Sequence, residues 1–239
     1  VAVAALAVGC DKPGEEPPAT QQAAGGCSGT CGTRPADKAG LVAVAIKLPR
    51  PMFEGTPKPV ADPNVEKPPG KLRGPFLAPA GTVNLAAGAD VTASDDMPVI
   101  GELELITDGN KSGAEGDFVE LESGKQWVQI DLGEARTIYA VVIWFYYKNP
   151  IAYNDVIVSV ADDAEFTRNV RVLFNNDHDN SSGQGKGPDT AFQARWWGEI
   201  VDARGPDAAG TKGRYVRVQT NGSTGDKGNC YVEIGVYGK

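Results

Sequence analysis

Histidine and basic residues are scarce in this 239-residue sequence. It has one histidine, and its 23 Lys and Arg residues stand against 31 Asp and Glu residues, which gives a formal net charge of -8. A single histidine excludes a zinc site built from several histidines and a series of c-type haem attachment motifs, each of which needs its own histidine. The acidic balance argues against duplex nucleic acid as a ligand and against membrane attachment through a basic surface.

Aromatic residues are almost absent from the first third of the chain. All four tryptophans, all seven tyrosines and five of the seven phenylalanines lie after Thr82, whereas thirteen of the seventeen prolines lie before it. A segment with so few large apolar side chains cannot bury a core of its own. We therefore expect one globular domain, residues 82–239, behind a long N-terminal leader.

The leader begins with nine small apolar residues, 1–9, followed by Cys10 and a polar stretch. This pattern is typical of the end of a secretory signal, and nine residues are too few to span a bilayer. The tripeptide before Cys10 resembles a bacterial lipobox, with Ala7 in place of the usual leucine. The resemblance implies cleavage before Cys10, lipid on its sulfur, and an exported protein anchored to the cell envelope, at the cell surface or facing the periplasm. The alternative is an ordinary apolar N-terminus.

Residues 10–40 are rich in Pro, Gly, Ala, Gln and Glu, a composition typical of a flexible tether. Cys27 and Cys31 lie among glycines within it. We expect a local disulfide between them, as in other exported proteins. The pair could also supply two metal ligands, but no further cysteine pair or histidine cluster completes such a site. Near the C-terminus, Cys230 is expected to be a buried free thiol.

Residues 41–81 form the last part of the leader. A short apolar run, 41–48, is followed by nine prolines between positions 49 and 79. This density of proline excludes a helix or a central strand and favours an extended arm. Because the arm carries Phe76 and other apolar residues, we expect it to lie against a surface, either that of its own domain or that of a partner.

The domain itself shows the two-residue periodicity of β-strands. Clusters of Gly, Asn, Asp and Ser separate the apolar segments, and no amphipathic helix of three turns is present. Residues 137–147 are apolar on both faces, as expected of a central strand of a sandwich. These features predict an all-β fold, an antiparallel sandwich or barrel. The predicted strands include residues 91–94, 127–132, 137–147, 156–160, 170–174, 214–219 and 231–237.

The order of these segments resembles the discoidin, or coagulation-factor type C, domain, which includes carbohydrate-binding modules of family 32. The resemblance covers residues 82–239 and implies a galactose-binding-like jelly roll with ligand-binding loops at one end. The matching segments are Asn84–Ala86, Val91–Ser94, Ile106–Gly109, Trp127–Gly133, Ile138–Ile143, Val156–Asp162, Arg214–Val218 and Glu233–Gly238.

The same resemblance implies a structural calcium ion. In family 32 modules and fucose-binding lectins, an aspartate turn and a glutamate of the last strand bind Ca²⁺, and the matching residues here are Asp108, Asn110, Ser112 and Glu233. Oxygen ligands of this kind suit Ca²⁺, which takes about six to eight of them. The alternative is that Asp108 begins a simple tight turn and that Glu233 faces solvent.

A second candidate cation loop spans residues 175–189. Asp177, Asp179 and Ser181 alternate as at the start of a calcium loop, but Ser182 and Pro188 stand where an EF-hand needs Gly and Glu. We favour Asx turns as the role of these side chains. The only histidine, His178, lies in this loop and is a candidate ligand contact.

Aromatic side chains are the third candidate feature. Sugars stack on aromatic rings and receive hydrogen bonds from neighbouring polar groups. Tyr153, Arg195, Trp196 and Trp197, with His178, are the expected ligand-binding residues. Two adjacent tryptophans in a strand cannot both face the core, so one is expected to be exposed or covered by another segment. The alternative is that many of these aromatics belong to the core.

No catalytic constellation is recognisable. The histidine has no partner in a nucleophile elbow, and no phosphate-binding or dinucleotide-binding fingerprint is present. We therefore expect a non-catalytic binding module of an exported lipoprotein that binds carbohydrate through its loops. The alternative is a structural subunit of a larger envelope complex, docked on an envelope protein by the proline-rich arm and the sandwich surface.

Overall fold

The computed structural model describes residues 40–239 except 53–57, 68 and 206–207. The apolar segment 1–9, the predicted lipidation site Cys10 and the Cys27–Cys31 pair lie outside the described residues. The chain divides into two units, Val1–Asp37 and Lys38–Lys239, and all of the described residues belong to the second unit.

The described residues form eleven strands and one short 3₁₀ helix. They contain no helix long and apolar enough to cross a membrane. The elements are β1 (Leu41–Ala43), β2 (Leu77–Pro79), β3 (Val83–Asn84), β4 (Asp90–Ala93), η1 (Leu103–Ile106), β5 (Val119–Leu121), β6 (Lys125–Phe145), β7 (Ile157–Ala161), β8 (Arg171–Asn175), β9 (Glu199–Asp202), β10 (Thr211–Asn221) and β11 (Asn229–Gly238).

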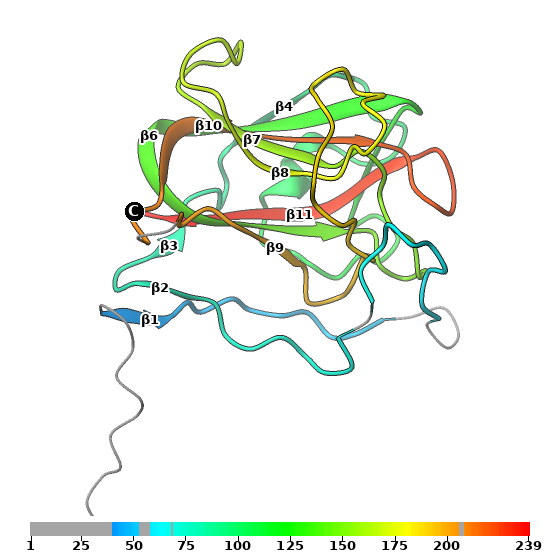
Figure 1. Ribbon diagram of the computed structural model, residues 1–239, viewed down its shortest axis with the longest axis horizontal. Coiled ribbons are helices and arrows are strands. Elements are labelled where there is room, and N and C mark those ends of the chain that lie inside the picture. Colours follow the sequence, from blue (N-terminus) through cyan, green and yellow to red (C-terminus); the bar gives the residue numbers. More distant parts are fainter. Residues whose placement is uncertain (1–39, 53–57, 68, 206–207) are drawn as a thin grey trace, which may run out of the picture. The chain divides into compact units, whose positions relative to one another are not determined.

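β6 is the longest strand and belongs to both layers of the sandwich. Its first half pairs with β4 and β10, and its second half pairs with β9 and β11. Gly133, at the change of direction, has a φ of +79°, which glycine adopts without strain. β7 and β8 extend the first layer, and β3 and β5 pair with β11 in the second. The strand pairs are antiparallel and the two layers enclose the core (Figure 1), which confirms the predicted β-sandwich.

The second half of β6 is apolar on both faces because both faces are buried. Val141, Ile143 and Phe145 point into the main core between the layers. Val142 and Trp144 point the other way, into a second apolar cluster on the outer face of the layer. Since successive side chains of a strand alternate between faces, only a strand covered on both sides can carry such a sequence.

The proline-rich arm covers this outer face. Its β1 and β2 pair with each other, and the Val44 N–H donates to the Phe76 carbonyl at 2.8 Å. Val44, Phe76 and Ala78 are buried in the outer cluster beside Trp144. Figure 1 shows the blue and cyan arm running below β9 and β11. Of the two surfaces considered for the arm, its described part lies on its own domain.

Between Val44 and Phe76, the arm also contacts a loop of the domain that leads to predicted site residues. Val65 forms a parallel bridge with Ala191, and the Glu66 N–H donates to the Ala191 carbonyl at 2.9 Å. The buried Gln193 side chain accepts a hydrogen bond of 3.1 Å from the Val60 N–H. The arm therefore contributes to the position of the segment that leads into Arg195 and the two adjacent tryptophans.

Cys230 is buried, as predicted, and has no disulfide partner among the described residues. Burial raises the pKa of its thiol to about 12. The thiol therefore stays protonated at neutral pH, and its side chain serves as part of the core.

Replacement of Phe76 by alanine tests the contribution of the arm to stability. The side chain is 8% exposed, and the Arg204 guanidinium lies 4.5 Å from its ring centre. We expect Phe76→Ala to lower the free energy of unfolding, measured in urea, by about 3 kcal/mol. Leu72→Ala, at an arm residue that is 47% exposed, is the control and should change it by less than about 0.5 kcal/mol. Equal stability of Phe76→Ala and the unaltered chain would show that the packing of the arm does not stabilise the domain.

Candidate functional site

Several loops meet at one end of the sandwich and surround a cavity of about 450 Å³. They are the connections from β6 to β7, from β8 to β9 and from β10 to β11, together with the arm. Isolated bridges between Ala152 and Gln193 and between Tyr153 and Ser223 tie the three connections together. The cavity is lined mainly by polar groups: Asp62, Asn64, Asn154, Asp155, Asn176, His178, Asp179, Ser181, Asn221 and Thr224, with Val65, Ala152, Tyr153 and Ala191.

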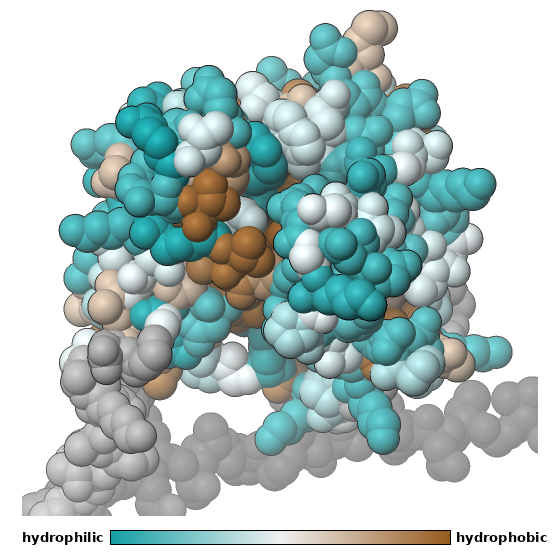
Figure 2. Space-filling view, turned by 45° about the horizontal axis from the view of Figure 1, so that its top comes forward, coloured by the Kyte–Doolittle hydropathy of each residue, from teal (hydrophilic) through white to brown (hydrophobic). Residues whose placement is uncertain are grey.

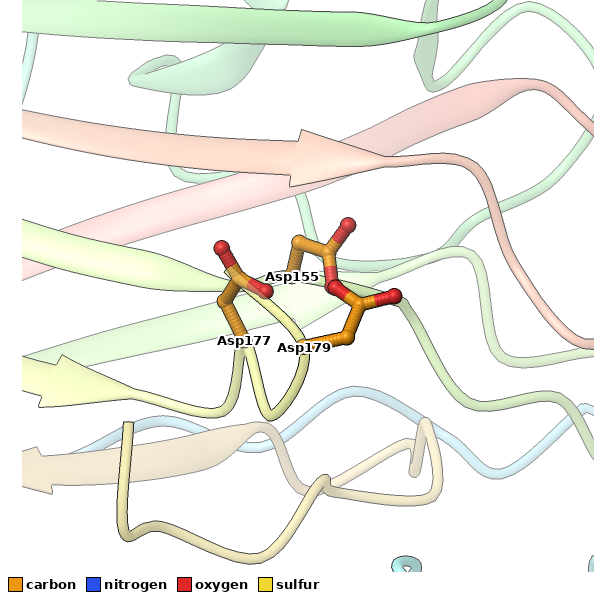
Figure 3. A group of neighbouring side chains, drawn as sticks. All are labelled: Asp155, Asp177 and Asp179. Carbon is orange, nitrogen blue, oxygen red and sulfur yellow. The ribbon is translucent and has the colours of Figure 1, made fainter. Parts of the chain in front are cut away.

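Three carboxylates lie together beside this cavity, and two of them, Asp155 and Asp179, line it. Asp155, Asp177 and Asp179 each have a carboxylate oxygen within 4.8 Å of the others (Figure 3). Asp177 is fully buried, Asp155 is half-buried and Asp179 is exposed. Asp155 has a φ of +49°, a strained backbone conformation for a non-glycine residue that is often found at functional sites. Such a group of oxygen ligands could hold a divalent cation.

Hydrogen bonds fix Asp177 in its ionised form. Burial alone would raise the pKa of its carboxyl, but hydrogen bonds from the Ser182 hydroxyl and from the Ser182 and Ser181 N–H groups outweigh burial and lower the pKa. The Ser181 N–H also donates to Asp179 at 2.8 Å. The predicted Asx turn is therefore confirmed for Asp179, whereas Asp177 accepts from residues four and five positions further along the chain. Asp179 also lines the cavity, and Asp177 is buried behind it.

His178 lines the cavity, and its role as a ligand contact stays a prediction. Its Nε2 lies 2.8 Å from the carbonyl oxygen of Asp189. This contact orients the imidazole ring within the loop and leaves the remainder of the ring beside the cavity.

The prediction for Tyr153 is wrong with respect to its aromatic ring. The side chain is 1% exposed and stacks on Phe145, with ring centres 4.3 Å apart. A ring enclosed in the main core has no face for a sugar. Tyr153 reaches the cavity only as part of the wall formed by residues 152–155.

The structure brings Arg195, Trp196 and Trp197 into a second, smaller pocket of about 180 Å³ with Tyr147 and Pro150. The two tryptophan rings are half-buried and meet edge to face, with centres 5.6 Å apart. Residues 150–153 and 191–194 separate this aromatic pocket from the polar cavity, because Ala194 and Gln193 pair with Ile151 and Ala152.

Arg195 is enclosed between two acidic groups. Its side chain is 9% exposed and forms ion pairs with Glu66 of the arm and with Glu199, the latter at 3.2 Å. Burial raises the pKa of Glu199 to about 8, and the Glu66 charge adds to this effect, although the Arg195 charge opposes it. One guanidinium therefore serves two carboxylates, and it has little freedom to move toward a ligand.

The predicted calcium residues also lie together, but a lysine is among them. The Glu233 side chain is fully buried, accepts the Gly109 N–H at 3.1 Å and lies 3.3 Å from the Lys111 ammonium. Burial raises the pKa of Glu233 to about 7, while the Lys111 charge lowers it. The alternative in which Glu233 faces solvent is thus wrong. Lys111 supplies a positive charge at the position where the resemblance implies a metal ion.

The other predicted ligands of that ion are engaged in the turn. Asp108 accepts the Asn110 N–H at 2.7 Å, and Asn110 accepts the Ser112 N–H at 3.1 Å. The Ser112 hydroxyl donates to Asp117. These bonds are those of a tight turn, the alternative interpretation of Asp108, and calcium binding here stays a prediction.

Sequence reasoning missed Asp155, Asn221 and the arm residues Asp62 and Asn64 as cavity residues. Asn221 donates to Asp155 at 2.8 Å across a separation of 66 residues. No local pattern marks such a contact. The Asn154-Asp155 dipeptide before a predicted strand was the one available signal, because both residue types favour turns.

No family model matches the sequence, and no curated protein matches it. Solved structures do. Chitosan-binding module 1 of a chitosanase/glucanase from Paenibacillus sp. IK-5 is 19% identical, and the match covers 65% of this chain and 99% of that chain at a TM-score of 0.45. The Clostridium perfringens module CpGH89CBM32-4, in complex with GlcNAc-alpha-1,4-galactose, is 14% identical and covers 67% and 96% at 0.44.

A fucolectin from striped bass (Morone saxatilis) serum is 17% identical, with coverage of 69% and 50% and a TM-score of 0.45. The similar structures thus include family 32 modules and a fucolectin, the groups that the sequence motifs resemble. At these identities the likeness concerns the fold alone, and the residues of this chain must carry any argument about its ligand.

The pH dependence of stability tests the burial of Glu199. Its folded pKa of about 8 lies above its ordinary value of 4.5, so the folded state holds the proton more tightly. This contribution to stability is fully present below about pH 4.5 and is lost as the pH rises toward 8, by at most about 1.4 kcal/mol per pH unit. Glu199→Gln should remove this loss in urea unfolding measured from pH 5 to 8. The exposed control Glu102→Gln should retain it, and parallel curves for the two variants would contradict the assignment.

Proposed function

We propose that the chain is a non-catalytic carbohydrate-binding protein that binds sugar in the polar cavity at the loop end. The observation that carries the proposal is the cavity itself. Its volume of about 450 Å³ lies in the range of small-molecule sites, and its walls combine carboxylate, amide, hydroxyl and imidazole groups.

Sugar hydroxyls both donate and accept hydrogen bonds, and such a wall matches both roles. Asp155 and Asp179 can accept hydrogen bonds from hydroxyl groups, and Asn154, Asn221 and Thr224 can donate. The adjacent aromatic pocket adds an apolar surface with two tryptophan rings, which suits the apolar faces of a second sugar unit.

A glycan and polysaccharide binding screen of the full chain tests the proposal. We expect a defined sugar to bind, and Asp179→Asn to weaken that binding about tenfold or more, since a hydrogen bond to a charged group contributes about 1.5–3 kcal/mol. Asp179 is exposed, so the substitution should leave the fold intact.

The matched control is Asp96→Asn, at an exposed aspartate outside the cavity, which should bind as the unaltered chain does. Failure of a folded chain to bind any glycan would refute the proposal. Equal loss in both aspartate variants would place the binding elsewhere.

We also propose a bound Ca²⁺ with a structural role. At the predicted loop, the ion would have to displace the Lys111 ammonium from Glu233. The Asp155, Asp177 and Asp179 carboxylates are the other group that could hold it. Running the screen and a thermal melt with calcium and with a chelator tests both, because Glu233→Gln and Asp179→Asn each remove one of the two sites.

Export and lipid anchoring at Cys10 remain part of the proposal and rest on the sequence. Loss of the protein from the membrane fraction in Cys10→Ser would support them, and unchanged fractionation would refute them.

The structure leaves less of the arm for the alternative function, a structural subunit docked on an envelope protein. The apolar arm residues Val44 and Phe76 contact their own domain, so they are not available for a partner. A feature that favours this alternative is the loop after β4, where Met97 is 81% exposed and Val99 is 56% exposed. A folded chain that binds no glycan would shift the weight to this surface.

A further inference from the structure

A further cavity, distinct from the polar cavity and the aromatic pocket, lies on the outer face of the other layer, formed by β6, β10 and β7. The strand register places Trp127, Gln219 and Ile157 in one row across these strands, and Gln129, Arg217 and Ser159 in the next row. Residues paired in this way point to the same face of a sheet. Their sequence neighbours, such as Val128, Val218 and Val158, point into the main core.

Arg217 is the centre of this face. Its guanidinium lies 4.3 Å from the ring centre of Trp127 and 4.0 Å from that of Phe166. It also donates to Gln129 Oε1 and, at 3.1 Å, to the Ala164 carbonyl. The side chain is therefore held in one orientation by two rings, an amide and a backbone group.

The loop that carries Phe166 is fixed over the sheet. Phe166 has a φ of +55°, an unfavourable conformation for a bulky residue that persists only where the surroundings impose it. The Asp163 carboxylate provides such support, because it accepts the N–H groups of Thr167 and Arg168. The Phe166 ring thus forms a rigid wall.

Between this wall and the loop that contains Gln184 lies a cavity of about 200 Å³. The Gln219 side chain lines it and is mostly buried. Its Oε1 accepts from Gln184 at 2.6 Å, but its Nε2 has no hydrogen-bond partner among the described residues. A buried amide N–H without an acceptor is costly, and an acceptor in the cavity would remove that cost.

Figure 2 looks obliquely onto the side of the protein where this layer lies. It shows a hollow in which hydrophobic (brown) side chains lie between hydrophilic (teal) ones. The cavity has the same mixture, since Ile157, Phe166 and Val170 stand beside Ser159 and Gln219. Its charged groups, Glu165 and Arg217, are of opposite sign.

We propose that this cavity is a second carbohydrate-binding site, which takes one neutral sugar unit. A hydroxyl of the sugar accepts the hydrogen bond of Gln219 Nε2, and the apolar face of the ring lies against Phe166 and Val170. The opposite charges of Glu165 and Arg217 give no preference for an anionic or cationic ligand. The inference shares its ligand class with the proposed function but uses residues outside the loop-end cavity. Two sites on one chain would let it hold a polysaccharide at two points, which raises the overall affinity.

Nuclear magnetic resonance of the labelled full chain tests this site separately from the loop end. The probes are D-glucose, D-galactose and N-acetyl-D-glucosamine. At least one should shift the Gln219 side-chain amide and the Arg217 Nε–H signals in a saturable way. In Gln219→Leu the Arg217 shift should require at least about tenfold more sugar. The thermal melt should be unchanged or higher, because the unpaired amide is gone.

Two further variants distinguish a loss of binding from a folding defect. Gln184→Ala, at an exposed residue of the cavity wall, should weaken the shift severalfold, and Gln126→Leu, at a glutamine of β6 outside the cavity, should not change it. Shifts at the loop-end residues without shifts at Gln219 and Arg217 would overturn this inference and leave the proposed function standing. The absence of shifts at both places in a folded chain would overturn this inference and the proposed function.

Discussion

The burial of Trp144 is the contact on which the other parts of the structure depend. Its side chain is fully buried on the outer face of β6, in the cluster that includes the arm residues Val44 and Phe76. Its indole N–H donates to the Trp196 carbonyl at 3.1 Å. A side chain at Gly198 would meet the indole ring at 2.6 Å, so the chain can cross the ring there only as glycine. One residue thus connects the sandwich, the arm and the aromatic pocket.

This role of Trp144 explains why the arm is both rich in proline and well packed. An outer sheet face with a large exposed indole would be a site for association with other chains. An extended segment covers such a face without needing a continuous hydrogen-bonded ladder, which prolines would interrupt. The few backbone bonds that the arm makes need no proline N–H: the Val44 N–H donates to the Phe76 carbonyl, and Pro79 accepts the Thr82 N–H through its carbonyl. The arm is therefore a third layer of the domain in its described part.

The limits of sequence reasoning follow from the same contacts. Periodicity predicted the longer strands and the double burial within residues 137–147, because both depend on neighbours along the chain. It did not predict β2, β3, β5 or β9, and it divided β6 into two strands. Spacing likewise brought Asp177 and Asp179 to one turn. It could not place Asp155 beside them, nor pair Arg195 with Glu66 across 129 residues. Tyr153 was misassigned because a tyrosine near a loop has the same local pattern whether its ring packs on Phe145 or faces solvent.

The loop after β8 connects the two cavities. Four of its residues, Asn176, His178, Asp179 and Ser181, line the polar cavity, and Gln184 lines the cavity on the sheet face. The buried Asp177 carboxylate holds the turn between them, and the Asn175 side chain donates to the Gly185 carbonyl at 3.1 Å. These bonds hold the loop in one conformation before a ligand binds. Binding at either cavity therefore costs less conformational entropy in this loop. A loss of the Asp177 hydrogen bonds would loosen a wall of both cavities at once.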